Sequence, residues 1–197
     1  MRTRVGYAGG TTEHPTYRRL GDHTETVEID FDPAQISYRK LLDVFWKSHD
    51  PTARPWSRQY KAVIFFHDEE QRKLALESKG REEARLKEKI YTEILPYTGF
   101  TLAEDYHQKY RLRQEQNLLK EFEAVYPSAR DFVNSTAAAR VNGYLGGYGT
   151  PEELKKEIDS YGLSMAAKRR LLDMLSSSRP AFKSCPLGGQ QSPIVEK

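Results

Sequence analysis

The most restrictive feature of the sequence is the segment 24–31, where apolar and polar residues alternate until a proline ends the pattern. Val27, Ile29 and Phe31 fall on one face of an extended chain, and threonine and acidic residues fall on the other. Such a strand must bury its apolar face against a second layer. Ser37 then offers a helix N-cap, and apolar residues at helical spacing follow it. A strand followed at once by an amphipathic helix predicts an α+β fold.

Further periodic segments extend this pattern along the chain. Strands are expected at residues 2–7, 61–66 and 91–95. A charged helix is expected from Asp68 to about residue 87, and another from Thr101, capped with the help of Glu104. Later helical segments are expected at 129–140, 152–160 and 164–175. The predicted domains are an α+β core at 1–114, a helical extension at 115–176 and a disordered tail at 177–197.

Composition narrows the class of protein. Lys and Arg number 31 against 28 Asp and Glu, a net charge of only +3, so nucleic-acid binding through the basic helices after residue 108 is a weak alternative. No apolar run is long enough for a membrane helix, and no secretory signal is visible, so we expect a cytoplasmic protein. The single cysteine, Cys185, excludes an intramolecular disulfide. We expect a monomer.

Glu25 is the most informative candidate for chemistry, because it falls at the end of the apolar face of segment 24–31. One interpretation is that the strand end frays and the carboxylate reaches solvent. The other is that partial burial disfavours its charged form and makes it a proton donor near neutral pH. His23, two residues earlier on the same face, and Tyr17 could hydrogen-bond into the same place.

Other polar residues have plausible structural roles. Tyr60 stands at the entry of the 61–66 strand, where a tyrosine is more often a core aromatic. Asp105 and His107 lie near the start of an expected helix, where they would complement its dipole. The five histidines lack paired spacing and a nearby cysteine, which argues against a zinc site. The glycine-rich segment GYLGGYG is better explained as a turn between helices than as a phosphate cradle.

Several segments together resemble the A-type peptide methionine sulfoxide reductases. They are, in order, VGYAGG, HPTY, DHTETVEIDFDP, ISYRKLLDVFWKSHDP, RQYKAVIFF, TEILP and LAEDYHQKY, and they cover residues 2–113. The later segment NSTAAARVNGYLGGYG is similar to the C-terminal extension of one branch of that family. The resemblance implies a two-layer α+β sandwich of ferredoxin-like order.

The resemblance also implies a reaction, the reduction of methionine-S-sulfoxide, free or in proteins, as a repair of oxidative damage. Glu25 would protonate the sulfoxide oxygen, Tyr17 and Tyr60 would hydrogen-bond it, and His23, Asp105 and His107 would contact substrate. A cysteine thiolate attacks the sulfur, methionine leaves, and a thiol reductant such as thioredoxin restores the resulting sulfenic acid. No bound cofactor and no metal is implied.

The chain departs from the family pattern at two places. The family's nucleophile lies in a GCFWG motif after a central first strand, upstream of the segment matching VGYAGG, and no such motif occurs here. We therefore expect a truncated chain of marginal stability, with unpaired strand edges, that is inactive as given. The segment before Tyr60 also lacks the family's acidic partner. Cys185 could at most be a recycling thiol. The alternative function is a non-catalytic module that binds methionine sulfoxide or a methionine peptide.

Overall fold

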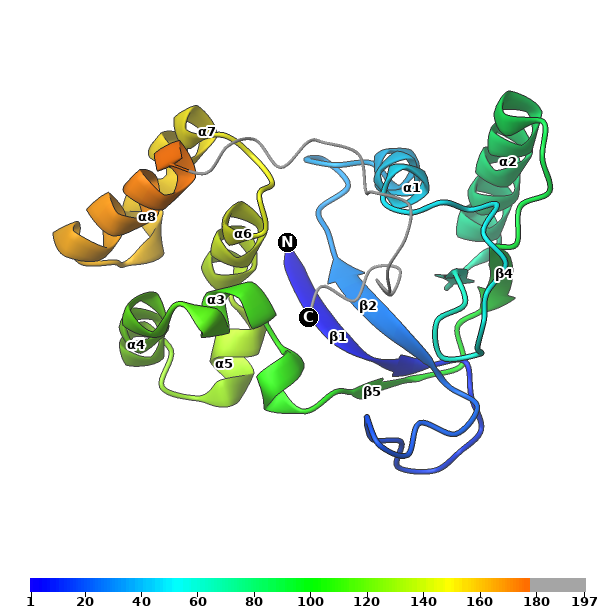
Figure 1. Cartoon of the computed structure of the whole chain (residues 1–197), viewed down its shortest axis with the longest axis horizontal. Coiled ribbons are helices and arrows are strands. Elements are labelled where there is room, and N and C mark those ends of the chain that lie inside the picture. Colours follow the sequence, from blue (N-terminus) through cyan, green and yellow to red (C-terminus); the bar gives the residue numbers. More distant parts are fainter. Residues whose placement is uncertain (178–197) are drawn as a thin grey trace. The chain divides into compact units, whose positions relative to one another are not determined.

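The computed structural model describes residues 1–177 of the chain, and they form two compact units. We call residues 5–104 the α+β unit, and residues 1–4 together with 105–177 the helical unit. Each unit is described by itself. Figure 1 shows the strands β1 to β5 and the helices α1 and α2 in blue to green, followed by the helices α3 to α8 in green to orange.

Two small sheets contain all the strands of the described residues. In the first, the order is β2-β1-β5, and β1 (Arg2–Ala8) pairs antiparallel with β5 (Phe100–Leu102), while β2 (Thr24–Asp30) lies at the edge. In the second, β3 (Val63–Phe66) and β4 (Glu93–Pro96) pair in parallel. The four strands expected from the sequence are thereby confirmed, with ends shifted by one or two residues.

Two helices build the core of the α+β unit. Helix α1 (Tyr38–Lys47) begins as expected at Ser37, whose side chain accepts a hydrogen bond from the Lys40 N–H group. Helix α2 (Glu69–Leu86) begins at the expected N-cap, Asp68, and continues past its internal glycine. Their apolar faces meet β3 in a shared cluster of buried residues, which are Leu42, Trp46, Ile64, Ala75 and Ile90. This cluster fixes α1 beside β3.

The prediction of a helix that begins at Thr101 is wrong. Thr101 lies in β5 and pairs with Tyr7. The carboxylate of Glu104, expected to cap a helix, instead accepts hydrogen bonds from the Tyr7 hydroxyl (2.7 Å) and the Tyr17 N–H group (3.1 Å). These long-range partners compete with a local cap and hold residues 100–104 extended. Helical structure resumes with the 3-10 helix η1 (Asp105–His107).

The helical unit contains the remaining helices. They are α3 (Tyr110–Gln114), α4 (Gln116–Val125), α5 (Ala129–Asn134), α6 (Thr136–Leu145), α7 (Pro151–Glu157), the 3-10 helix η2 (Ile158–Tyr161) and α8 (Met165–Ser177). The single helix expected at 129–140 is divided, because the Ser135 hydroxyl caps α6 by accepting from the Ala138 N–H group. After α6, Gly147 and Gly149 have positive φ angles, so the glycine-rich segment forms a turn as expected.

The helical unit has its own apolar core. Leu112, Leu118, Phe122, Val141, Leu154 and Leu171 are fully buried in one cluster. The predicted division at residues 114 and 115 stays a prediction, and the predicted tail lies, from residue 178 on, outside the described residues. Helices combined with small sheets confirm the α+β class. Among residues 1–177, none of the helices has the length and apolar character that a membrane-spanning segment needs.

Candidate functional site

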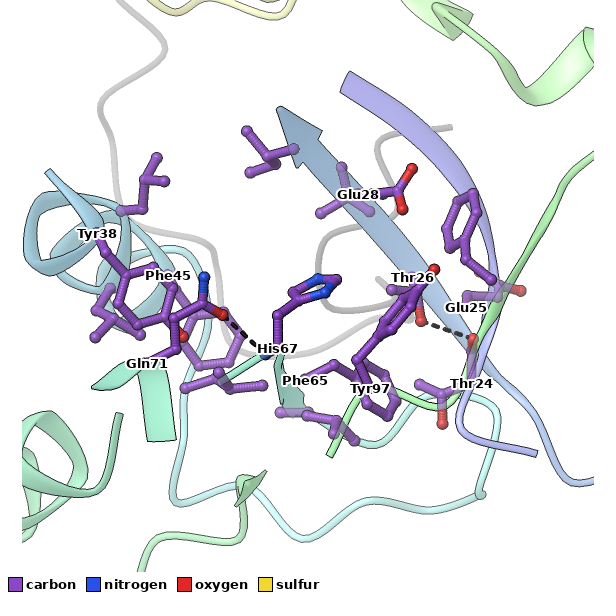
Figure 2. A pocket seen from close by; sticks show the side chains of 18 of the residues that line it. Thr24, Glu25, Thr26, Glu28, Tyr38, Phe45, Phe65, His67, Gln71 and Tyr97 are labelled. Atoms are coloured by element: carbon purple, nitrogen blue, oxygen red, sulfur yellow. Dashed lines mark hydrogen bonds between the residues drawn. The ribbon is translucent and has the colours of Figure 1, made fainter. Parts of the chain in front are cut away.

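A cavity of about 230 Å³ lies within the α+β unit, between β2, α1 and β3. Its wall is mainly apolar, with contributions from Val27, Ile29, Leu41, Phe45, Val63 and Phe65. Figure 2 shows Glu25 and Tyr38 on opposite sides of this pocket, with Phe65 and His67 between them. All the residues of β2 from 24 to 29 line the cavity, and its apolar residues contribute through Val27 and Ile29.

Glu25 occupies one side of the cavity and is half-buried. Its Oε1 atom accepts a 2.6 Å hydrogen bond from the Gln59 Nε2 atom, and its backbone N–H group donates to the Gln59 carbonyl at 3.3 Å. Its Oε2 atom is buried and has no hydrogen-bond partner among the described residues. Gln59 fixes the position of this carboxyl group, and the Oε2 atom can exchange a proton or form a hydrogen bond with a ligand in the apolar cavity.

Two further polar atoms on the helix side of the cavity lack partners in the described part of the chain. They are the hydroxyl of Tyr38 and the Nε2 atom of His49, and both are buried. Burial, together with the negative charge of Asp68, raises the pKa of Tyr38 to about 12, so its hydroxyl stays a neutral donor at neutral pH. Sequence reasoning treated Tyr38 only as part of an apolar helix face and gave His49 no role.

The state of His49 follows from its surroundings. Burial lowers the pKa of its imidazole, although a hydrogen bond to the Phe45 carbonyl and the charge of Asp50 act in the opposite direction. The Nδ1 atom lies 3.0 Å from that carbonyl and therefore carries the proton. The Nε2 atom is then a hydrogen-bond acceptor. The Tyr38 hydroxyl, the His49 Nε2 atom and the Glu25 Oε2 atom can thus offer a donor, an acceptor and a carboxyl oxygen to a ligand.

His23 and its neighbour Asp22 organise the loop between β1 and β2. The buried His23 ring accepts from the Gly10 N–H group at Nδ1 (3.3 Å), and its Nε2 atom lies 2.9 Å from the Thr12 carbonyl. Hydrogen bonds from the N–H groups and hydroxyls of Thr12 and Thr11 hold the pKa of Asp22 well below its usual range. Both ring nitrogens of His23 are therefore engaged by backbone, and its contact with substrate stays a prediction.

Tyr17 and Tyr60 are not among the residues that line the cavity. Tyr17 packs in a small cluster with Tyr7 and Leu20. The ring of Tyr60 lies with its centroid 4.8 Å from that of Trp56, a side chain that is 80% exposed. Tyr60 directly follows Gln59, the hydrogen-bond partner of Glu25. The roles of both tyrosines stay predictions.

Two of the remaining predicted site residues, Asp105 and His107, lie outside the α+β unit. They are the first and last residues of η1 in the helical unit, where the ring centroids of Tyr106 and His107 are 4.1 Å apart. Cys185 lies outside the described residues. Within residues 1–177, no group of three or more His, Cys, Asp or Glu side chains is arranged to hold a metal ion.

Comparison with known proteins places these observations in a family. Residues 1–140 match the family model described as peptide methionine sulfoxide reductase. A Drosophila melanogaster protein of that name is 46% identical over 166 residues, which are 83% of this chain and 66% of that protein. The peptide methionine sulfoxide reductase MsrA of Methanosarcina acetivorans is 46% identical over 133 residues, 61% of this chain and 71% of the other.

A solved structure is also similar. The crystal structure of Mxr1 from Saccharomyces cerevisiae in reduced form has a TM-score of 0.54 and 29% identity, over 58% of this chain and 71% of that one. The chain spans about two thirds of the length of the Drosophila relative.

Proposed function

Because the chain belongs to the peptide methionine sulfoxide reductase family, we propose that its α+β unit binds the sulfoxide group of oxidised methionine. The observation that carries this proposal is the Oε2 atom of Glu25, which is buried beside an apolar cavity and lacks a partner among the described residues. A sulfoxide combines an oxygen that accepts hydrogen bonds with apolar methyl and methylene groups, so this pairing of acid and apolar wall matches it.

The proposed chemistry assigns one role to each group. The protonated carboxyl of Glu25 donates to the sulfoxide oxygen, and Tyr17 and Tyr60 add hydrogen bonds as charge develops on that oxygen. A thiolate attacks the sulfur, the S–O bond breaks as the oxygen passes to the thiol, and methionine and a sulfenic acid result. A thiol reductant such as thioredoxin then returns the sulfenic acid to the thiol, with loss of water.

The source of the attacking thiolate separates two candidate functions. Cys185 is the single cysteine of this sequence, and we propose that it is not the attacking group. This chain alone would then bind methionine sulfoxide, as a free amino acid or in a protein, without reducing it. The finer architecture, a two-layer sandwich of ferredoxin-like order, and action as a monomer in the cytoplasm belong to the same proposal. The competing candidate is a reductase in which the Cys185 thiolate attacks the sulfur.

A binding experiment tests the site. We expect a peptide containing methionine-S-sulfoxide to bind the full chain more tightly than the same peptide with methionine, as measured by calorimetry. Glu25→Gln keeps an acceptor for Gln59 but removes the acid, and should weaken sulfoxide binding by about tenfold, the equivalent of about 1.4 kcal/mol. The matched control is Glu28→Gln, which removes a carboxylate from the same cavity wall and should change binding little. Equal losses in the two variants would refute the assignment of Glu25.

A turnover experiment decides between the two functions. The full chain, the sulfoxide peptide and dithiothreitol are incubated together, and methionine is measured by chromatography. We expect no methionine above the level of the protein-free reaction. Methionine formation that is lost in Cys185→Ser would establish the alternative, in which the tail thiol attacks the sulfur.

A further inference from the structure

The two tryptophans of the chain lie in opposite environments. Trp46 is 4% exposed, whereas Trp56, in the segment between α1 and β3, is 80% exposed. The ring of Trp56 packs against that of Tyr60, with an angle of 37° between the two planes. Tryptophan is enriched at binding surfaces, because its ring combines a large apolar area with a polar N–H group. The exposed side of Trp56 therefore marks a candidate contact surface.

Two cationic side chains meet at one aromatic ring close to this tryptophan. The Cζ atom of Arg54 lies 5.9 Å, and the Nζ atom of Lys89 5.2 Å, from the centroid of the Tyr91 ring. Both cations belong to exposed residues, and within residues 1–177 neither forms an ion pair with a carboxylate, the adjacent Glu88 included. The ring holds the two like charges near each other but does not neutralise them. A bound carboxylate would.

Backbone contacts bring the tryptophan and the two cations into one region. The Tyr91 N–H group donates to the Pro51 carbonyl at 2.9 Å, so the segment that follows Pro51 begins beside Tyr91. Pro55 restricts the residue before it, Arg54, to extended conformations. Since two residues span at most about 7 Å, the backbone of Trp56 lies close to that of Arg54. We call four residues the basic-aromatic patch, namely Arg54, Trp56, Lys89 and Tyr91.

Acidic residues near the patch are already engaged. No Asp or Glu occurs from residue 51 to residue 67. The carboxylate of Asp50 accepts hydrogen bonds from the N–H group (2.9 Å) and the hydroxyl (2.7 Å) of Thr52. Glu93 forms an ion pair with Lys61 at 2.8 Å. The patch therefore keeps an excess of positive charge.

The chemistry of the patch selects the class of its partner. Carboxylates would pair with Arg54 and Lys89, and an apolar side chain would cover Trp56. A single-stranded nucleic acid instead requires a groove of cations that follows its phosphates, and the whole chain has a net charge of only +3. Charge complementarity thus favours a protein.

We propose that the basic-aromatic patch binds an acidic segment of another protein, with an apolar residue among its acidic ones. None of the four patch residues lines the cavity of the candidate site. The proposal is therefore independent of sulfoxide binding.

Tryptophan fluorescence tests the proposal on the full chain with the peptide acetyl-Glu-Glu-Leu-Glu-Glu-amide. Because Trp46 is buried, quenching by acrylamide reports mainly on Trp56. At saturation, we expect the quenching constant to fall by about twofold, since the peptide excludes solvent from one side of the indole. The peptide acetyl-Gln-Gln-Leu-Gln-Gln-amide has the same shape without charge, and should bind about tenfold more weakly.

Charge variants locate the binding. Arg54→Gln combined with Lys89→Gln should weaken binding of the acidic peptide by about tenfold. The matched control combines Lys73→Gln with Arg81→Gln, which removes two exposed charges from α2 and should change binding little. Arg54→Glu combined with Lys89→Glu should reverse the preference, so that acetyl-Lys-Lys-Leu-Lys-Lys-amide binds more tightly than the acidic peptide.

Three results would overturn the proposal. The first is equal affinity for the glutamate and glutamine peptides, or no protection of Trp56 by either. The second is an equal loss of affinity in the two glutamine double variants, which would show that only net charge matters. The third is equal protection of Trp56 by single-stranded hexathymidylate, which would assign the patch to nucleic acid. These peptides contain no methionine, so a failure of sulfoxide binding would not affect the outcome.

Discussion

Replacing Ser78 by alanine should reveal how much one buried hydrogen bond between α1 and α2 contributes to the free energy of unfolding. The Trp46 Nε1–H group donates to the Ser78 hydroxyl at 3.0 Å, and that hydroxyl donates to the Ala75 carbonyl at 2.7 Å. The exposed fractions are 1% for Ser78 and 4% for Trp46, so water cannot replace the lost acceptor. In Ser78→Ala the indole N–H group therefore remains buried without a partner.

The expected cost follows from the asymmetry between made and missing hydrogen bonds. Leaving a buried donor unsatisfied costs about 1–3 kcal/mol, whereas a serine-to-alanine change in a helix gains at most about 0.7 kcal/mol of propensity. We expect a net loss of about 1–2 kcal/mol in the free energy of unfolding. For a unit of this size each kcal/mol lowers the melting temperature by roughly 4–8 °C.

A double-mutant cycle isolates this effect. Trp46→Phe removes the N–H group, so Ser78→Ala in that background should be nearly neutral, while helix propensity contributes equally to both backgrounds and cancels. The four proteins are compared by urea unfolding followed by far-UV circular dichroism, with the slope m required to stay constant. An equal loss on Ser78→Ala with and without the indole would show that the hydrogen bond contributes nothing.

Two other perturbations test the loop that leads from β1 to β2. Gly9 has φ +76°, and an added methyl would lie 2.6 Å from the Phe65 ring, so Gly9→Ala should cost about 1–2 kcal/mol or more. The matched control is Gly80→Ala in α2, where the added methyl meets nothing within 4 Å, and this change should stabilise the protein by about 0.5–1 kcal/mol. Equal melting temperatures of the Gly9→Ala and Gly80→Ala variants would contradict this reasoning. Because the folded-state pKa of Asp22 is lowered, its contribution to the free energy of unfolding is fully present above the unfolded pKa of about 3.9 and declines as the pH falls below it. The difference in melting temperature between wild type and Asp22→Asn should therefore be constant above about pH 5 and shrink steadily below about pH 4, with part of it still present at about pH 2. A difference that stays constant down to about pH 2 would exclude the carboxylate as the cause.

Features that depend on neighbouring residues in the sequence, such as the helix N-caps, could be predicted. The caps at Ser37 and Asp68 could be identified because a side-chain acceptor stands before each helical pattern, and both accept the expected N–H groups. Thr101 carries the same kind of signal but pairs with Tyr7 in β5. No local pattern in the sequence shows that the carboxylate of Glu104 accepts hydrogen bonds from two distant tyrosines and not from a helix N-terminus.

The candidate site shows the same difference between local signals and long-range contacts. Strand alternation placed Glu25 with the apolar face of β2. Glu25 lines the cavity, but so do all the other residues from 24 to 29, and its place on the apolar face stays a prediction. Its partner Gln59 comes from a segment 34 residues later, which no periodicity in the sequence connects to β2. Tyr38 and His49 could not be recognised either, because their importance comes from the packing of α1 over the cavity and not from their spacing.

The parallel pairing of β3 and β4 has a consequence for the order in which the chain folds. Parallel neighbours need a crossover connection, and here α2 supplies it within the same segment, residues 63–96. The contacts of this β-α-β segment are closer in sequence than the pairing of β1 with β5, which closes a loop of more than ninety residues. Loop closure over such a separation is entropically costly and slow. We therefore expect the β3-α2-β4 segment to consolidate first and to serve as the template on which the first sheet assembles.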